Sequence, residues 1–72
     1  MQAIFEEDYR GHAIRVVAIG HGPFRWRFAI DGDVLTFDGD AYFNTTEIAL
    51  RDGRSAARFE IDLRLAFEGG EA

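Results

Sequence analysis

The chain has 72 residues, of which 13 are acidic and 8 are basic, so its formal net charge is −5. This balance argues against a general polyanion binder, because nonspecific affinity for nucleic acid comes from Lys and Arg side chains that neutralise phosphates. There is no Cys, which excludes disulfides and the thiolate ligands of a structural zinc site. A domain this short buries only about 60% of its unfolded surface, so we expect a single domain over residues 1–72 that gains support from tight packing or from a homodimer.

No apolar run is long enough to span a membrane. The first residues, M-Q-A-I-F-E-E-D, are acidic where a secretory signal would be basic. We therefore expect a cytoplasmic protein with no membrane association. The last residues, 68–72, are E-G-G-E-A, and we expect this tail to be disordered.

The first half of the chain shows the alternation of an antiparallel sheet. A two-residue turn at residues 10–11 is expected between A-I-F-E-E-D-Y and H-A-I-R-V-V-A-I. That turn places Glu6 opposite Arg15, an ion pair across two strands. The segment G-H-G-P at residues 20–23 forms the next connection, because Pro ends a strand ladder.

A second hairpin is expected at Asp31-Gly32, the two-residue signature in which both residues take positive φ. The register that this turn sets puts Arg25 opposite Asp38. Because side chains alternate across a strand, the arginines and the aromatic residues separate onto opposite faces. The face expected to be covered carries Trp26, Phe28, Ile30, Leu35 and Phe37, and the open face carries Arg25, Arg27, Thr36 and Asp38.

A helix is expected from about Thr45 to at least Phe59. Asn44 and Glu47 have the spacing of a capping box, with Thr45 as the alternative cap. The stripe expected to face the sheet consists of Ile48, Ala49, Ala56 and Phe59, with Glu47, Arg51, Arg54, Ser55 and Arg58 opposite. Gly53 interrupts the helix and is expected to let it approach the sheet closely.

The segment F-E-I-D-L-R-L-A-F at residues 59–67 fits two structures. Its strict alternation is typical of a strand, whereas the i, i+4, i+8 spacing of Phe59, Leu63 and Phe67 continues the helix. Helix is favoured because no turn signal interrupts it. In either form the segment carries more apolar surface than one small sheet can cover, and we expect a dimer interface at Ile61, Leu65 and Phe67.

Two patterns could indicate an active or metal site. The repeats D-G-D at residues 31–33 and 38–40 suggest a calcium loop, but at about 3.3 Å per residue they lie on the order of 16 Å apart and are expected to be turns. His12 and His21 have no carboxylate nearby in sequence, and the one Ser of the chain, Ser55, lies on the polar side of the helix. We therefore expect no catalytic residue, no metal and no cofactor.

Short motifs resemble two groups of proteins. Y-R-G at residues 9–11, R-W-R at 25–27 and F-N-T-T-E-I-A at 43–49 resemble the ethylene-response-factor and integrase N-terminal domains, in which a three-stranded sheet enters the major groove of DNA. That resemblance implies nucleic-acid contacts at Arg15, Arg25 and Arg27. The chain also resembles small bacterial single-domain proteins with a Tyr-Arg-Gly hairpin, which carry no assigned activity.

The sequence thus predicts an α+β fold, a three- or four-stranded antiparallel β-meander with one C-terminal α-helix packed across one face. The expected function is that of a small non-enzymatic binding or interaction module that self-associates as a homodimer. The alternative is a sheet-mediated DNA-binding protein.

Overall fold

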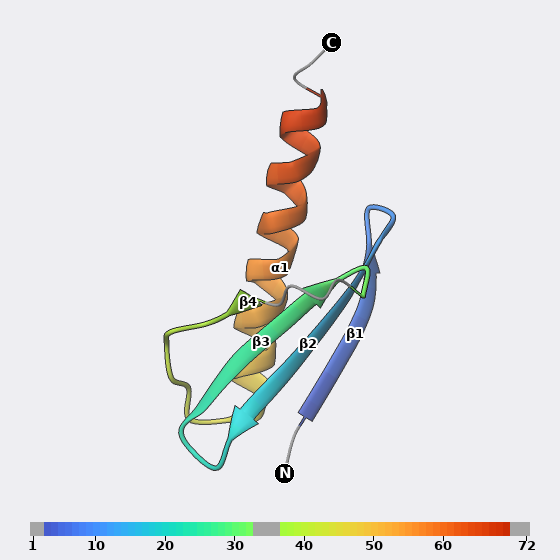
Figure 1. Cartoon of the computed structure of the whole chain (residues 1–72). Helices are drawn as coiled ribbons and strands as arrows, with labels where there is room; N and C mark the ends of the chain where they lie inside the picture. Colours follow the sequence, from blue (N-terminus) through green and yellow to red (C-terminus); the bar gives the residue numbers. More distant parts are fainter. Residues whose placement is uncertain (1–2, 33–36, 70–72) are drawn as a thin grey trace.

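The computed structural model describes residues 3–32 and 37–69 (Figure 1). This part of the chain forms five elements: β1 (Ala3–Tyr9), β2 (His12–Gly20), β3 (Phe24–Ile30), the two-residue β4 (Phe37–Asp38) and α1 (Thr46–Gly69). The strands lie in the order β1-β2-β3-β4, each antiparallel to its neighbour. The predicted α+β meander with one C-terminal helix is confirmed. Of the tail predicted to be disordered, residues 68 and 69 still belong to α1, and the others lie outside the described residues.

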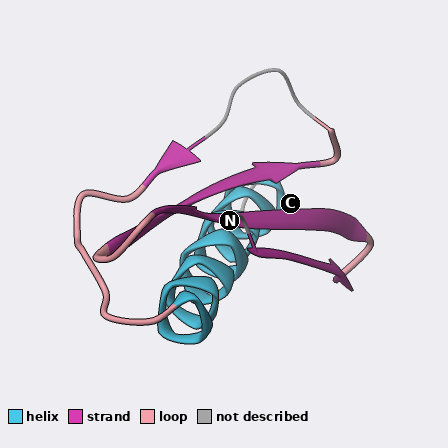
Figure 2. Ribbon diagram, turned by 90° about the horizontal axis from the view of Figure 1, so that it is seen from below, coloured by secondary structure: helices cyan, strands magenta, loops and turns pink. Residues whose placement is uncertain are grey.

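The molecule has two layers, because α1 covers one face of the sheet and leaves the other open (Figure 2). The buried core lies between them and consists of Ile14, Val16, Ala18, Phe28, Ile30, Ala49, Ala57 and Ile61. A helix of 24 residues is about 36 Å long at 1.5 Å per residue, and α1 extends well beyond the sheet (Figure 1). The core therefore holds only part of the helix against the strands.

The first hairpin has the predicted register. Arg10 and Gly11 both take positive φ, 50° and 85°, which matches the twist of a two-residue hairpin turn. Glu6 lies opposite Arg15, with the Arg15 Nε 3.7 Å from the Glu6 Oε2. A two-residue loop leaves no freedom in the pairing of the strands that it joins. The sequence alone was therefore enough to predict the register of β1 and β2.

The predicted register of β3 and β4 is wrong by two residues. Asp31 and Gly32 do take positive φ, 56° and 68°, but Asp38 pairs with Arg27 rather than with Arg25. Asp31 continues the ladder to β2, since its backbone N donates to the Ala13 O at 2.7 Å. The described chain resumes as strand only at β4. A shift of two residues preserves the alternation of faces, so Asp38 keeps its predicted place on the open face, and Leu35 and Thr36 lie outside the described residues.

The helix begins with Thr45 as its cap, the alternative to the predicted Asn44. The Thr45 Oγ1 accepts a hydrogen bond from the Ile48 backbone N at 3.1 Å. From there α1 runs without a break to Gly69. Residues 59–67 are therefore helical, which confirms the favoured one of the two predicted structures. The stripe expected to face the sheet is partly wrong, because Ile48 is 42% exposed and Phe59 is 65% exposed.

Small residues decide which side of α1 meets the sheet. Ala49, Gly53, Ala57 and Ile61 repeat every four residues, and all four are buried. A Cβ at Gly53 would lie 2.6 Å from the Val16 Cγ1 and 3.0 Å from the Trp26 Cβ, which confirms the predicted close approach. Trp26 lies on this covered face as predicted: its ring stacks on Phe28 at 5.3 Å, and its Nε1 donates to the Asp52 Oδ2 at 2.8 Å.

Across the two described segments, no helix is both long enough and apolar enough to cross a membrane.

Candidate functional site

The three arginines predicted to contact nucleic acid all project from the open face of the sheet. Arg15 lies on β2 and Arg25 and Arg27 lie on β3, at the alternating positions that point away from α1. Each has a neighbour of its own. Arg15 faces Glu6, the Arg27 Nε lies 2.6 Å from the Asp38 Oδ1, and the Arg25 guanidinium lies 5.9 Å from the centre of the Tyr42 ring. The basic character of this face is therefore partly neutralised by its own carboxylates.

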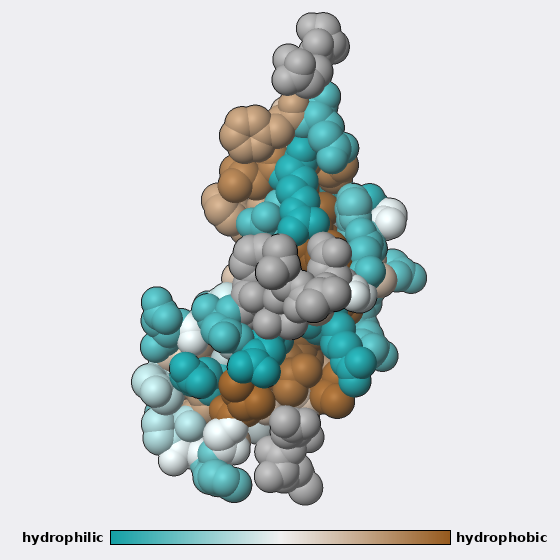
Figure 3. Space-filling model, in the orientation of Figure 1, coloured by the Kyte–Doolittle hydropathy of each residue, from teal (hydrophilic) through white to brown (hydrophobic). Residues whose placement is uncertain are grey.

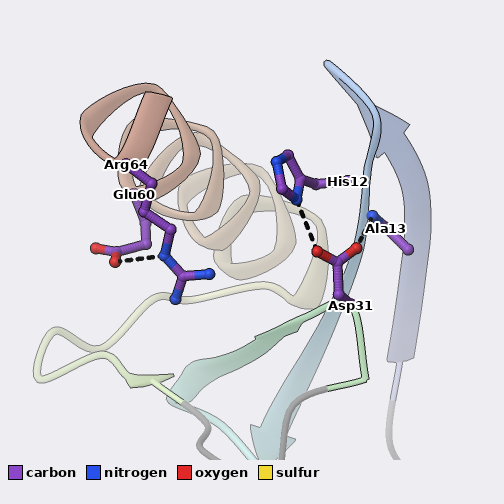
Figure 4. A network of polar contacts seen from close by, with 5 residues as sticks. All are labelled: His12, Ala13, Asp31, Glu60 and Arg64. Atoms are coloured by element: carbon purple, nitrogen blue, oxygen red, sulfur yellow. Dashed lines mark hydrogen bonds and ion pairs between the residues drawn. The ribbon is translucent and has the colours of Figure 1, made fainter. Parts of the chain in front are cut away.

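His12 has a carboxylate partner that is distant in sequence. Its Nδ1 lies 2.7 Å from the Asp31 Oδ2, and the Asp31 Oδ1 accepts a hydrogen bond from the Ala13 N at 2.8 Å (Figure 4). The hydrogen bond with His12 is the main reason that the pKa of Asp31 lies below its ordinary value, with smaller contributions from Ala13 and from the charge of Arg64. Asp31 thus ties the end of β3 to the start of β2, which is a structural role.

A polar cluster joins the end of β1 to the middle of α1. The Arg58 guanidinium donates two hydrogen bonds to the Glu7 carboxylate, at 2.7 and 2.8 Å. The Tyr9 OH donates to Asp62 at 2.9 Å, and the Arg10 Nη1 donates to the same carboxylate at 2.8 Å. Arg58 also lies over the Tyr9 ring, 4.9 Å from its centre.

The pKa values in this cluster follow from its hydrogen bonds. Donation from Arg58 lowers the pKa of Glu7, although partial burial opposes the shift. Donation from Arg10 and then from Tyr9 lowers the pKa of Asp62, and the hydrogen bond to Asp62 raises the pKa of Tyr9. These shifts all stabilise the charge state that the cluster needs at neutral pH. None of these groups is left unpaired to act on a substrate.

A small hollow lies between β1 and the first half of α1. Its volume is about 230 Å³, and it is lined by Phe5, Glu47, Leu50, Arg51 and Arg54. Arg54 lies with its guanidinium 5.6 Å from the centre of the Phe5 ring. No local sequence pattern predicts this hollow, because the strand and helix residues that line it are more than 40 positions apart.

The second half of α1 carries an exposed apolar stripe. Phe59, Leu63 and Phe67, here called the apolar ridge, are 65%, 43% and 74% exposed. Figure 3 shows hydrophobic side chains gathered on α1 where it rises beyond the sheet. The i, i+4, i+8 spacing was visible in the sequence. Its exposure follows from the Ala49-Gly53-Ala57 repeat, which turns a different side of the helix to the strands.

The residues predicted for a dimer interface separate into three environments. Ile61 is fully buried and belongs to the core, so it has no surface to offer to a second chain. Leu65 is half-buried and packs against the core. Phe67 is 74% exposed and lies on the apolar ridge. Any interface on this part of α1 therefore uses the ridge and not the side that carries Ile61.

Few side chains in the described segments are placed to bind a metal ion or to catalyse a reaction. No three His, Asp or Glu side chains come together there in an arrangement that could hold a metal ion. Ser55 is exposed on α1, and the side-chain hydrogen bond of His12 goes to Asp31 rather than to a hydroxyl. The nucleophile and base that covalent catalysis would require within hydrogen-bond reach are not paired in this part of the chain.

No family model matches the chain, and no curated protein or solved structure is significantly similar to it. The fold and the surfaces define a small α+β domain with one covered sheet face, one open sheet face and an exposed helical ridge. The resemblances drawn from short sequence motifs stay predictions.

Proposed function

We propose that this protein is a non-enzymatic interaction module that self-associates through the apolar ridge. The observation that carries the proposal is the exposure of three large apolar side chains on one stripe of a helix. Single exposed apolar residues are ordinary on protein surfaces, but a contiguous apolar patch is typical of an interaction site. The small size of the chain adds to the argument, since a domain of this length gains stability from a partner.

A second copy of the chain is the occupant that the ridge fits. An aromatic side chain can bury about 150–250 Å², so the exposed parts of the three ridge residues offer on the order of 350 Å² per copy. Two facing ridges remove about 700 Å² from water, and the flanking residues would have to supply the remainder of the 1,200–2,000 Å² or so that specific interfaces bury. Ala56 and Ala66 flank the ridge with small side chains that permit close approach of a second helix.

The order of the ridge residues suits an antiparallel pair of helices. With Leu63 on a two-fold axis, Phe59 of each copy faces Phe67 of the other. Glu60 and Arg64 lie on one flank and form an i, i+4 ion pair at 3.1 Å within the helix. In the antiparallel arrangement Arg64 of one copy lies two positions from both Glu60 and Arg64 of the other, so these charges permit the pairing but do not select it, whereas the ridge residues face one another as a two-fold interface requires.

A matched pair of substitutions tests this proposal. Leu63 on the ridge and Ile48 near the start of α1 are 43% and 42% exposed, so Leu63→Glu and Ile48→Glu add the same charge at similar cost to the monomer. Sedimentation equilibrium at micromolar concentration is expected to show a dimer for the wild type and for Ile48→Glu, and a monomer for Leu63→Glu. Circular dichroism checks that both variants keep their helix.

Two results would contradict the proposal. One is a wild-type protein that is monomeric at micromolar concentration. The other is a Leu63→Glu variant that dimerises as strongly as Ile48→Glu, since the contact would then lie elsewhere.

The open face of the sheet supports a second candidate function, sheet-mediated binding of DNA. The observation in its favour is that Arg15, Arg25 and Arg27 share that face. The test is a titration with duplex DNA at low salt, in which the amides of these residues should shift and the shifts should weaken as salt rises, because each phosphate contact releases counterions. Amide signals that do not shift at low salt would eliminate this candidate.

A further inference from the structure

The hollow between β1 and α1 contains two arginines that form no ion pair in the described structure. Five of the eight arginines of the chain form an ion pair: Arg10, Arg15, Arg27, Arg58 and Arg64. Within the described residues, Arg25, Arg51 and Arg54 form none. Two of these three line the same hollow. Carboxylates outnumber bases in this chain by 13 to 8, so a shortage of acidic partners does not explain the unpaired arginines.

Arg54 also carries a buried donor that has no acceptor. Its Nε is out of contact with solvent and forms no hydrogen bond in the described structure. Buried polar groups in proteins nearly always have a hydrogen-bond partner, and one that lacks a partner calls for an explanation. The side chain is held in place from one side, because its guanidinium packs over the Phe5 ring. This contact holds the guanidinium beside the hollow that both residues line.

The lining of the hollow selects the kind of anion. A guanidinium presents a planar fork of N–H donors, which matches the two oxygens of a carboxylate. Phe5 and Leu50 make the wall apolar, and this suits a carboxylate attached to a hydrocarbon group. Glu47 also lines the hollow and, with the net charge of −5, opposes a doubly charged phosphate.

We propose that the hollow lined by Phe5, Glu47, Leu50, Arg51 and Arg54 binds a monocarboxylate that bears a short apolar group. The carboxylate accepts hydrogen bonds from the terminal guanidinium nitrogens of Arg54 and is attracted by Arg51. The apolar group packs on Phe5 and Leu50. A free aliphatic acid and the C-terminal carboxylate of a peptide with an apolar last residue share this chemistry. This site lies apart from the apolar ridge and does not depend on self-association.

Nuclear magnetic resonance titration tests the proposal, with the Arg54 Nε–Hε signal as the readout. The probes are hexanoate, its neutral analogue hexanamide, inorganic phosphate, and a short peptide ending in Leu with either a free or an amidated C-terminus. Saturable shifts of the Arg54 signal are expected with hexanoate and with the free-acid peptide. Hexanamide, the amidated peptide and phosphate are expected to leave the signal unchanged or to bind at least about ten times more weakly.

Arg25 provides the matched control, because it too has no ion pair but lies on the open face of the sheet. Arg54→Gln is expected to weaken hexanoate binding about tenfold or more, and Arg25→Gln to leave it unchanged. Arg51→Gln is expected to weaken hexanoate binding by a smaller factor. It replaces Arg54→Gln as the test variant if Arg54→Gln perturbs the fold. Tighter binding of the free-acid peptide than of hexanoate would identify a chain terminus as the natural ligand, and the reverse order would identify a free acid.

Three results would overturn the site. They are the absence of any saturable shift up to millimolar hexanoate and peptide, equal binding of hexanoate and hexanamide, and an Arg25→Gln variant that loses as much affinity as Arg54→Gln. Phosphate that binds more tightly than hexanoate would overturn the choice of a monocarboxylate.

Discussion

Replacing Gly53 with Ala tests how closely α1 packs on the sheet. In an exposed helix this change stabilises by about 1 kcal/mol, because Ala restricts the unfolded chain and has the higher helix propensity. Here the added Cβ would lie 2.6 Å from the Val16 Cγ1 and 3.0 Å from the Trp26 Cβ. Val16 is fully buried and β-branched, so its side chain has few other rotamers.

The helix must therefore move away from the sheet, and overpacking of this kind costs about 1–3 kcal/mol. With a contact this short we take the upper end, so that after the propensity gain Gly53→Ala is destabilising by about 2 kcal/mol. For a domain of this size that lowers Tm by about 8–16 °C.

Thermal unfolding followed by circular dichroism measures the effect, with wild type and variants at equal concentration. Ser55→Ala is the control, since Ser55 is exposed on the same helix and its replacement should raise Tm slightly through propensity alone. A Gly53→Ala variant that melts at or above the wild-type temperature would refute the reasoning, because the space beside Gly53 would then accept a methyl group.

Three further predictions concern the ion pair on β1, the cap and the core stripe of the helix. Arg58 keeps the pKa of Glu7 below 4.5 in the folded state, so the unfolded state takes up a proton first as pH falls. The contribution of this carboxylate is therefore complete above about pH 4.5 and is lost as pH falls through the lower folded pKa, and Glu7→Gln should flatten the acid limb of a denaturation curve measured against pH. Thr45→Ala removes the acceptor for the Ile48 N and should lower the free energy of unfolding in urea by about 1 kcal/mol. The control, Asn44→Ala, should change that free energy by less than about 0.5 kcal/mol. Equal losses would mean that Thr45 is not the cap. Ile61→Ala should cost about 2–5 kcal/mol because the side chain is fully buried, while Phe59→Ala, measured at a concentration where the protein is monomeric, should stay within about 0.5 kcal/mol; the opposite order would mean that the other stripe of α1 faces the sheet.

Local rules predicted the first hairpin but not the second. The turn at residues 10–11 fixes the register of β1 and β2 by itself, and its residues show the required backbone angles. The turn at residues 31–32 shows similar angles, yet Asp31 is held by His12 and Ala13, 19 and 18 residues earlier in the chain. A contact between residues so far apart leaves no trace in a window of sequence, so the strand was expected to return two residues too early.

The helix shows a different limit. The stripe expected to face the sheet was Ile48, Ala49, Ala56 and Phe59, which includes large apolar side chains at both ends. The structure instead buries Ala49, Gly53, Ala57 and Ile61, because the small residues among them let α1 approach β2 and β3, and it leaves Ile48 and Phe59 exposed. Size, and not only polarity, decides which face of a helix packs on a flat sheet. Applied to the sequence, the same argument would have moved the expected interface from Ile61 to the apolar ridge.

The hollow at Arg51 and Arg54 could not be predicted from the sequence alone. Its apolar wall comes from Phe5 on β1 and Leu50 on α1, its charge comes from α1, and nothing local connects Phe5 with Arg54. Both arginines appeared in the sequence only as members of the polar side of the helix. That they form no ion pair became visible only once the positions of the carboxylates were known.

The length of α1 has a consequence for how the molecule opens. Amides near Ala57 and Ile61 are covered by the sheet, so their exchange with solvent deuterons requires the helix to leave the core. Around Ala66 and Phe67 the side chains are exposed, and those amides exchange when the last turn frays by itself. One continuous helix is therefore expected to show a steep gradient of protection along its length, from the slowest amides of the molecule to some of the fastest.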